Sequence, residues 1–180
     1  MNTTRTTISE EYRAMQAELH ARGNYGVTAM QYGATVLKLL ELCGASTLLD
    51  YGCGSKRSLL MGMNVPPHVH YEGYDPAVPA YANRPQPAQL VVCIDVLEHI
   101  EHEYLESVLD DLAELCNPFG FFTIHTGPAV KFLRDGRNAH LIQQGQGFWF
   151  ARLEKRFTIL SSNPVPSGFA VLVRSLSAPE

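Results

Sequence analysis

The segment Ser46-Thr-Leu-Leu-Asp-Tyr-Gly-Cys-Gly54 decides the fold of this chain. Its first half is a short apolar run, which is typical of a buried strand. Gly52 and Gly54 then allow a tight turn and a close approach of a ligand to the backbone. The residues after the turn, Arg57 to Met63, predict a helix. A strand that passes through a glycine turn into a helix is the first unit of an α/β fold.

The rest of the chain continues this alternation of strands and helices. A strongly patterned helix is predicted from Glu101 to Leu115, and Asn117–Gly120 is predicted to be a turn. The order of elements predicts an α/β fold with a mostly parallel sheet, helices on both faces and a closing antiparallel hairpin. Further strands are expected at His70–Asp75, Gln89–Asp95, Phe121–His125, Arg156–Ser161 and Phe169–Arg174.

The first 44 residues have a different pattern from the rest. Ser9 resembles a helix N-cap, and a helix is expected from there to about Ala21. A second helix is expected from Thr28 to Gly44. We therefore predict one domain over residues 1–180, with a helical cap at 1–44 and an α/β core at 45–180. Residues 127–150 are rich in loop-forming residues and give no clear prediction.

Composition excludes several classes of protein. The chain has 180 residues, 46% of them hydrophobic and 18% charged, with a formal net charge of −4, so intrinsic disorder is excluded. No apolar run is long enough to span a membrane, and the first residues lack the apolar stretch of a secretion signal. The four cysteines are scattered, which favours a reduced, cytoplasmic protein. The acidic balance disfavours duplex nucleic acid as a partner.

Polar side chains follow four of the predicted strands: Asp50, Asp75, Asp95 and His125. Ligands of parallel α/β sheets bind at the carboxyl ends of the strands, so these residues predict a functional rim. The dinucleotide pattern G-x-G-x-x-G fails, because Arg57 stands at its third glycine. The turn therefore suits a nucleoside without a phosphate chain. Asp75 could accept hydrogen bonds from ribose hydroxyls, and Asp50 could order the turn.

Three short motifs, in this order and spacing, resemble those of class I S-adenosylmethionine-dependent methyltransferases. They are Leu49–Gly54, Tyr74-Asp75-Pro76 and Cys93–Ile100, and the resemblance extends over residues 46–126. It implies a Rossmann-like fold with seven strands, the last antiparallel, and S-adenosylmethionine as cofactor. The methionine part would lie along the glycine turn and the ribose on the carboxylate of the second motif. The implied cofactor-binding residues are Asp50, Tyr51, Gly52, Cys53, Gly54, Asp75, Pro76, Asp95 and Val96.

Two features depart from the family pattern. Lys56 stands where many members have a third glycine. Only 20 residues separate Asp75 from Asp95 (95 − 75), an interval in which many members fit a further strand and an adenine-contacting acid. Here that interval contains four prolines and no acid before Ala88. The adenine would therefore be bound by backbone near Asn83 and Arg84.

A polar cluster, Asp95-Val-Leu-Glu98-His99, follows the third strand. If this turn is helical, Asp95 and His99 share a face. Transfer of a methyl group to oxygen needs a base, and His99 and the later His140 are candidates. We predict Glu98, His99 and His140 as the catalytic residues. A purely structural role for the cluster is the alternative.

The same cluster resembles the divalent-metal site of small-RNA 2′-O-methyltransferases and of some quinone-pathway O-methyltransferases. Asp95 would replace the first glutamate of that pattern, and His140 would be the distal ligand. The resemblance implies that a divalent cation could bind at Asp95, Glu98, His99 and His140. Metal-free catalysis by the same residues is the alternative, and we predict no resident metal ligand.

The predicted function is therefore S-adenosylmethionine-dependent O-methylation of a small molecule, a sugar or a nucleoside. The motif [DN]-P-P-[YF] of exocyclic amino methylases is missing at Asp95, which argues against that chemistry. Lys131, Arg134 and Arg137 could meet an anionic acceptor group or form a solvated loop. The alternative function is a non-catalytic module that binds S-adenosylmethionine or S-adenosylhomocysteine as a sensor or subunit. The sequence makes no prediction of oligomeric state.

Overall fold

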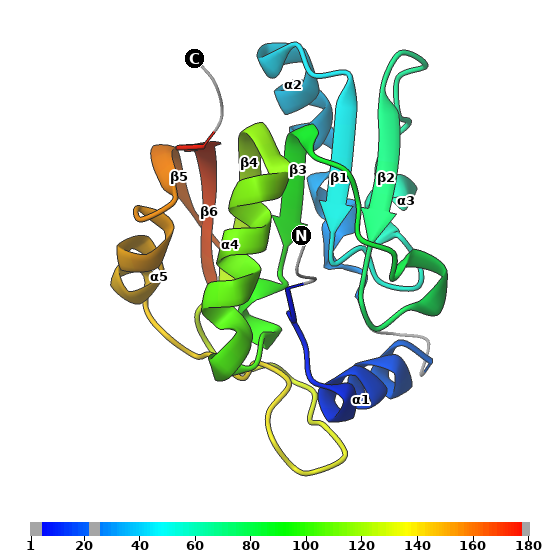
Figure 1. Cartoon of the computed structure of the whole chain (residues 1–180), viewed down its shortest axis with the longest axis vertical. Coiled ribbons are helices and arrows are strands. Elements are labelled where there is room, and N and C mark those ends of the chain that lie inside the picture. Colours follow the sequence, from blue (N-terminus) through cyan, green and yellow to red (C-terminus); the bar gives the residue numbers. More distant parts are fainter. Residues whose placement is uncertain (1–4, 22–25, 178–180) are drawn as a thin grey trace.

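A six-stranded sheet forms the centre of the computed structural model, which describes residues 5–21 and 26–177 (Figure 1). The strand order is β2-β1-β3-β4-β6-β5. Strands β1 to β4 are mutually parallel, and β6 is antiparallel to both of its neighbours. This confirms the predicted mostly parallel sheet with an antiparallel last strand. The strands are β1 (Thr47–Tyr51), β2 (His70–Tyr74), β3 (Ala88–Ile94), β4 (Cys116–His125), β5 (Phe157–Val165) and β6 (Gly168–Ser175).

Helices cover both faces of the sheet, and α1 lies apart from them (Figure 1). None of the helices in the described part of the chain is long and apolar enough to cross a membrane. The α-helices are α1 (Glu10–Ala21), α2 (Gly33–Cys43), α3 (Ser58–Met61), α4 (Leu105–Leu115) and α5 (Gln146–Leu153). Short 3₁₀ helices lie at η1 (Thr28–Tyr32), η2 (Pro79–Tyr81), η3 (Leu97–His99) and η4 (His102–Tyr104).

The period of two along each strand divides the core into two halves. Leu49 of β1 and Val91 of β3 face α4 and α5 in one buried cluster, which also contains Trp149. Their neighbours Leu48 and Leu90 face α2 and α3 in the other cluster. The parallel strands are therefore apolar on both faces, as a sheet covered by helices requires.

Of the two helices expected to form a cap over residues 1–44, α2 packs on the sheet through Val36 and Leu40. Helix α1 instead belongs to a third, smaller cluster. There Met15 and Leu19 pack against Leu133 and Ala139 of the segment between β4 and α5. Figure 1 shows α1 and this segment together at the carboxyl end of the parallel strands.

The seven strands implied by the family resemblance are wrong for the described residues, which form six. Along the chain, the missing strand would lie after β2 and before β3, where the chain instead forms the short helix η2. Proline has no amide hydrogen to donate to a sheet ladder, and Pro76, Pro79, Pro85 and Pro87 all fall in this interval. Strand β2 is consequently an edge strand.

Two local predictions also need correction, and the segment 127–150, for which the sequence makes no clear prediction, contains part of a helix. Asn117–Gly120 is part of β4 rather than a turn. Residues 127–150 contain the start of α5, whose Trp149 is fully buried in the core. The helix expected from Glu101 begins as the 3₁₀ turn η4 and becomes α-helical only at Leu105. In each case packing against the sheet determines the local structure.

Gly33, the first residue of α2, provides a test of the packing between η1, α2 and α3. Its φ of −53° suits any residue, but an added Cβ would overlap the Gly62 carbonyl oxygen. We predict that Gly33→Ala lowers the free energy of unfolding by about 1–3 kcal/mol, as overpacking does. Urea unfolding followed by circular dichroism measures this change.

Gly147 in α5 is the matched control, because a Cβ there would meet no atom within 4 Å. Gly147→Ala should leave the stability unchanged or raise it by up to about 1 kcal/mol, since alanine favours the helix. Equal stability of the two variants would show that the Gly33–Gly62 contact is looser than described.

Candidate active site

A cavity of about 370 Å³ lies at the carboxyl ends of β1 to β4. Residues that follow all four of these strands contribute to its wall, and α1 and the segment 127–140 complete it. The lining residues used below are Tyr12, Gln16, His20, Tyr51, Gly52, Cys53, Gly54, Asp75, Pro76, Asp95, Val96, His99, His125, Lys131 and His140.

The glycine turn after β1 forms one end of the cavity. Gly52 has a φ of +82°, and an added Cβ would overlap the Val96 side chain, so only glycine fits there. The amides of Gly52 and Cys53 donate to the Tyr74 carbonyl at 2.7 and 3.0 Å. Both amides are therefore engaged within the protein, although Gly52, Cys53 and Gly54 line the cavity. The close approach of a ligand to the backbone that the sequence predicts here therefore cannot use these two amides as donors.

Asp75 lies beside the turn, at the end of β2. Its Oδ2 accepts a hydrogen bond from the Gly54 amide at 3.0 Å, and its Oδ1 accepts one from the Ala77 amide at 2.9 Å. Burial raises the pKa of this carboxyl, although the nearby His20 and the two amides oppose the shift. Each oxygen retains a second lone pair. Asp75 thus presents acceptor capacity to the cavity, as a ribose-binding carboxylate must.

Asp50 lies behind the turn and is not part of the cavity wall. Its Oδ2 accepts a hydrogen bond from the Tyr71 hydroxyl at 3.0 Å. Burial raises the pKa of Asp50 to about 7. Direct cofactor contact by Asp50 is therefore not supported, whereas its predicted role in ordering the turn fits its place.

Asp95 ends β3 with a φ of +51°, an uncommon conformation for a residue with a side chain. Its amide donates to Oγ1 of Thr123 at 3.0 Å, and this hydroxyl donates to Oδ1 of Asp95 at 2.7 Å. After this residue the chain changes direction and enters the 3₁₀ helix η3. Asp95 and His99 therefore do not share one face of an α-helix, contrary to the prediction.

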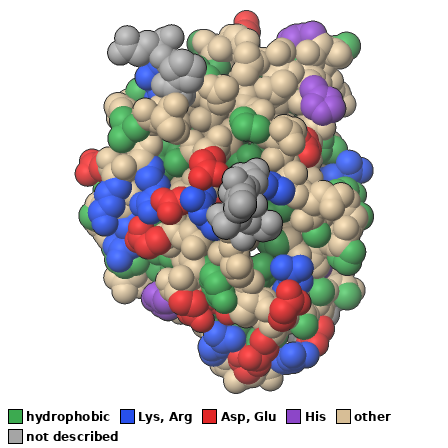
Figure 2. Space-filling model, in the orientation of Figure 1, with side chains coloured by type: hydrophobic (Ala, Val, Ile, Leu, Met, Phe, Trp, Pro, Cys, Tyr) green, Lys and Arg blue, Asp and Glu red, His purple; other side chains and the backbone are tan. Residues whose placement is uncertain are grey.

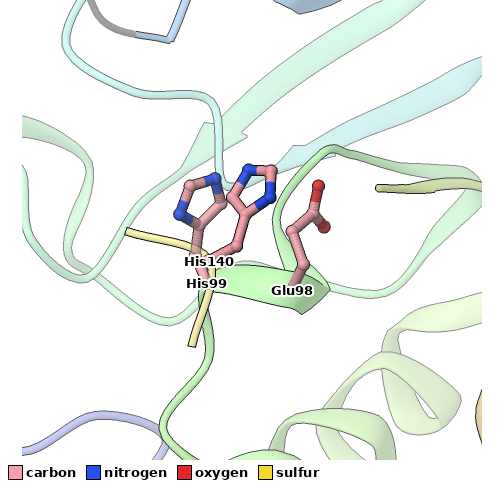
Figure 3. Close-up of side chains that lie close together, drawn as sticks. All are labelled: Glu98, His99 and His140. Carbon is pink, nitrogen blue, oxygen red and sulfur yellow. The ribbon is translucent and has the colours of Figure 1, made fainter. Parts of the chain in front are cut away.

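Two histidines stand in the cavity wall beyond Asp95 (Figure 3). The ring centroids of His99 and His140 are 4.6 Å apart, and the rings are nearly perpendicular. A third ring, that of His125, lies 4.7 Å from His140. His99 comes from η3 and His140 from the segment after β4, so the fold unites residues 41 positions apart (140 − 99).

Backbone carbonyls fix the orientation of both rings. Nδ1 of His99 lies 2.7 Å from the Ala139 carbonyl oxygen, and Nδ1 of His140 lies 2.7 Å from that of Gly127. Because a carbonyl can only accept, Nδ1 must carry the proton in each neutral ring. Burial lowers the pKa of His99 to about 3 and also lowers the pKa of His140. Both imidazoles are therefore neutral near pH 7, with an Nε2 lone pair.

Glu98 lies beneath this pair, fully buried and outside the cavity wall. Its Oε1 accepts a hydrogen bond from the His125 amide at 3.1 Å, while Oε2 has no hydrogen-bond partner among the described residues. Burial and the neighbouring Asp95 raise the pKa of Glu98 well above its usual value. An unpartnered buried carboxylate oxygen is costly and indicates a role beyond packing.

Glu98, His99 and His140 each offer a ligand atom, and these atoms lie within 4.8 Å of one another. Oxygen and imidazole nitrogen are ligands for a divalent cation. The fourth residue of the expected metal set, Asp95, is outside this group, because its carboxylate bonds to Thr123. The structure therefore brings the three predicted catalytic residues together, with Asp95 outside the group.

Sequence reasoning missed the contribution of α1. Tyr12, Gln16 and His20 all line the cavity. Their spacing of four residues on a helix that also carries Met15 and Leu19 was the available signal. Conversely, Asn83 and Arg84 do not line the cavity.

The arginines that the sequence suggested as binding residues form ion pairs within the protein. Arg84 pairs with Asp111 at 2.6 Å. Arg134 pairs with Glu18 at 2.5 Å, and Arg137 with Asp135 at 2.7 Å. Lys131 alone of the three suggested anion-binding residues lines the cavity.

Solved structures of low sequence identity share this fold. The 1,6-didemethyltoxoflavin-N1-methyltransferase of Burkholderia thailandensis, with bound 1,6-didemethyltoxoflavin and S-adenosylhomocysteine, has a TM-score of 0.66 and 15% identity; the match covers 97% of this chain and 93% of that one. The N-methyltransferase NodS of Bradyrhizobium japonicum, in complex with S-adenosylhomocysteine, has a TM-score of 0.60 and 12% identity, with coverages of 91% and 100%.

A third similar structure is an O-methyltransferase family protein from Burkholderia thailandensis, with a TM-score of 0.57, 11% identity, and coverages of 93% and 64%. No curated protein matches the sequence. The family described as "Methyltransferase domain" matches residues 20–162, which is most of the chain. The chain therefore belongs to the methyltransferase-domain family, among the class I S-adenosylmethionine-dependent methyltransferases that its sequence resembles.

Proposed function

We propose that this protein transfers the methyl group of S-adenosylmethionine to an oxygen atom of a small molecule, a sugar or a nucleoside. One observation carries the proposal: a single cavity joins the glycine turn and Asp75 to the histidine pair His99 and His140. A donor held at one end and an acceptor held at the other would meet inside it. Such alignment is the main contribution that an enzyme makes to a displacement reaction.

The cofactor would occupy the end of the cavity between the glycine turn and Asp75. The ribose hydroxyls would donate to the remaining lone pairs of the Asp75 carboxylate. Tyr51 to Gly54, Pro76 and Val96 would line the same space, and Asp50 would support the turn from behind. The bound S-adenosylhomocysteine in the similar structures from Burkholderia and Bradyrhizobium supports this choice of cofactor.

The histidine end of the cavity suits an acceptor hydroxyl. The acceptor oxygen would attack the methyl carbon as the bond from that carbon to sulfur breaks, leaving S-adenosylhomocysteine. Nε2 of His140 would take the hydroxyl proton, because its Nδ1 proton is already donated to Gly127. Nε2 of His99 would accept a hydrogen bond, and the Asp95 carboxylate, whose charge favours the protonated form of His140, would stabilise the resulting imidazolium.

The Glu98–His99–His140 group also fits a divalent cation. Glu98 supplies an unpartnered buried oxygen, and both rings donate their Nδ1 proton to backbone carbonyls, as metal-binding histidines commonly do. A bound Mg²⁺ or Mn²⁺ would supply Lewis-acid activation of the acceptor hydroxyl. The three residues would hold the ion, and the ion would keep Glu98 ionised.

The surface charge supports a small acceptor over duplex nucleic acid. On the face shown in Figure 2, Lys and Arg side chains are interspersed with Asp and Glu, and the chain has a net charge of −4. Binding to a nucleic-acid backbone needs a positive field.

A non-catalytic module that binds the cofactor as a sensor or subunit is the second candidate. Lys56 in place of the family's third glycine and the lack of an acid between Pro76 and Ala88 favour it. Binding without turnover would support this reading.

Asp75 tests the cofactor placement. We predict that Asp75→Ala and Asp75→Asn weaken S-adenosylhomocysteine binding about 100-fold, because two hydrogen bonds to a charged group are lost. Isothermal titration calorimetry measures the dissociation constant, and thermal unfolding checks that each variant is folded. Asp135→Ala, in an exposed loop, is the control and should bind normally. Normal binding by the folded Asp75 variants would move the ribose elsewhere.

His140 tests the chemistry. We expect the wild-type protein to release S-adenosylhomocysteine from S-adenosylmethionine when offered a panel of sugars, nucleosides and small alcohols or phenols. His140→Ala should lower kcat by about 10²–10⁴, the usual contribution of a general base, and change cofactor affinity less than about threefold. His68→Ala, at an exposed position before β2, is the control. A protein that binds the cofactor but methylates no acceptor in the panel would favour the sensor function.

Metal dependence separates the two modes of catalysis. If a cation is used, chelator-treated protein should bind Mn²⁺ by calorimetry, and Glu98→Gln or His140→Ala should weaken this binding at least tenfold. His102→Ala, outside the group, should bind Mn²⁺ as the wild type does. Full turnover after chelation, with no Mn²⁺ bound at millimolar concentration, would assign the reaction to the side chains alone.

A further inference from the structure

One side of α1 faces the cavity with three polar residues, Tyr12, Gln16 and His20. Gln16 donates a hydrogen bond to the Tyr12 hydroxyl at 2.5 Å, and this hydroxyl donates to the His99 carbonyl at 2.5 Å. The polar side of α1 thus begins at the histidine end of the cavity. His20, two helical turns further along, lies at the other end.

His20 lies against the Asp75 carboxylate. Its Nε2 is 3.6 Å from Oδ2 of Asp75, the same oxygen that accepts the Gly54 amide. The ring also lies over the glycine turn, 3.1 Å from the point where a Gly54 Cβ would stand. Only 11% of the His20 side chain is exposed. An imidazole is therefore held at the junction of the two structures that form the proposed cofactor site.

The position of α1 is fixed by contacts away from this junction. Met15 and Leu19 pack against Leu133 and Ala139, as described above. Ser9, before the helix, donates from its amide and hydroxyl to the buried Glu101 at 2.8 and 2.7 Å. These contacts hold the helix backbone, so the placement of His20 does not depend on its contact with Asp75.

The chemistry of a neutral imidazole matches that of a hydroxyl group. Burial lowers the pKa of His20, and the nearby Asp75 opposes the shift. A neutral ring has one N–H donor and one lone pair, and a ribose hydroxyl can pair with either. The ionised Asp75 carboxylate can accept hydrogen bonds but has no proton to donate. A ribose diol in contact with both groups would find a donor or an acceptor on His20 and an acceptor on Asp75.

We infer that His20 is a cofactor-binding residue, which forms a hydrogen bond to a ribose hydroxyl of S-adenosylmethionine beside Asp75. Helix α1 thereby supplies the wall of the nucleoside site opposite the glycine turn. This inference rests on the proposed placement of the ribose at Asp75.

Two ligands test the inference by calorimetry. S-adenosylhomocysteine carries adenosine and the aminocarboxylate tail, whereas 5′-methylthioadenosine carries the same adenosine unit without that tail. His20→Ala should weaken the binding of both by the same factor, about tenfold for one lost hydrogen bond. His20→Gln, which retains a donor and an acceptor, should recover part of the affinity for both. His68→Ala, an exposed histidine at the opposite end of β2, should bind both normally.

Other outcomes would overturn the inference in distinct ways. Weaker binding of S-adenosylhomocysteine alone would assign His20 to the tail. Tighter binding of both ligands by His20→Ala would show that the ring blocks the ribose position. Normal binding by His20→Ala would remove it from the site. Thermal unfolding of each variant checks its fold.

The Asp75 variants separate this inference from the proposed function. If Asp75→Asn loses S-adenosylhomocysteine binding and His20→Ala binds normally, only the role of His20 is contradicted. Normal binding by both variants would contradict the placement of the ribose at Asp75.

Discussion

The Asp75 carboxylate accepts one amide from the turn after β1 and one from its own turn after β2. The first of these hydrogen bonds, with the two amides that donate to the Tyr74 carbonyl, ties the ends of the neighbouring parallel strands β1 and β2 together. Burial of the carboxylate opposes its charge, and charge-assisted hydrogen bonds from amides offset that cost. The shape of the cavity depends on this link, because it sets where the glycine turn lies relative to β2.

The histidine end of the cavity is built on the same principle of backbone support. Carbonyls of Ala139 and Gly127 hold His99 and His140, and the His125 amide holds Glu98. Backbone groups therefore help to orient all three ionisable side chains. What they share is burial, which lowers the pKa of both histidines and raises that of Glu98. These pKa shifts keep His99, His140 and Glu98 uncharged until a histidine takes up a proton or the group binds a cation.

The sequence predicts the parts of this arrangement that are local. The strand before Gly52, the acid after β2 and the apolar run of β3 each follow from a few adjacent residues, so the fold class was predictable. Other parts arise from packing between distant segments. Gly52 and Cys53 lie in the predicted turn, but only the tertiary structure engages their amides with Tyr74. His20 is an ordinary helix residue until α1 packs on the segment that carries Leu133.

The two ends of the cavity differ in how they are attached to the fold. The proposed cofactor end is built mainly from strand ends, which the hydrogen-bonded sheet holds in register. The histidine end is completed by residues 127–140, which pack in a separate small cluster on α1, the helix that reaches both ends of the cavity. Substitutions in this cluster would reshape the acceptor space without disturbing the sheet. The similar methyltransferases with 15–17% identity to this chain share its fold although they are named for different acceptors, so the sheet alone does not determine the acceptor.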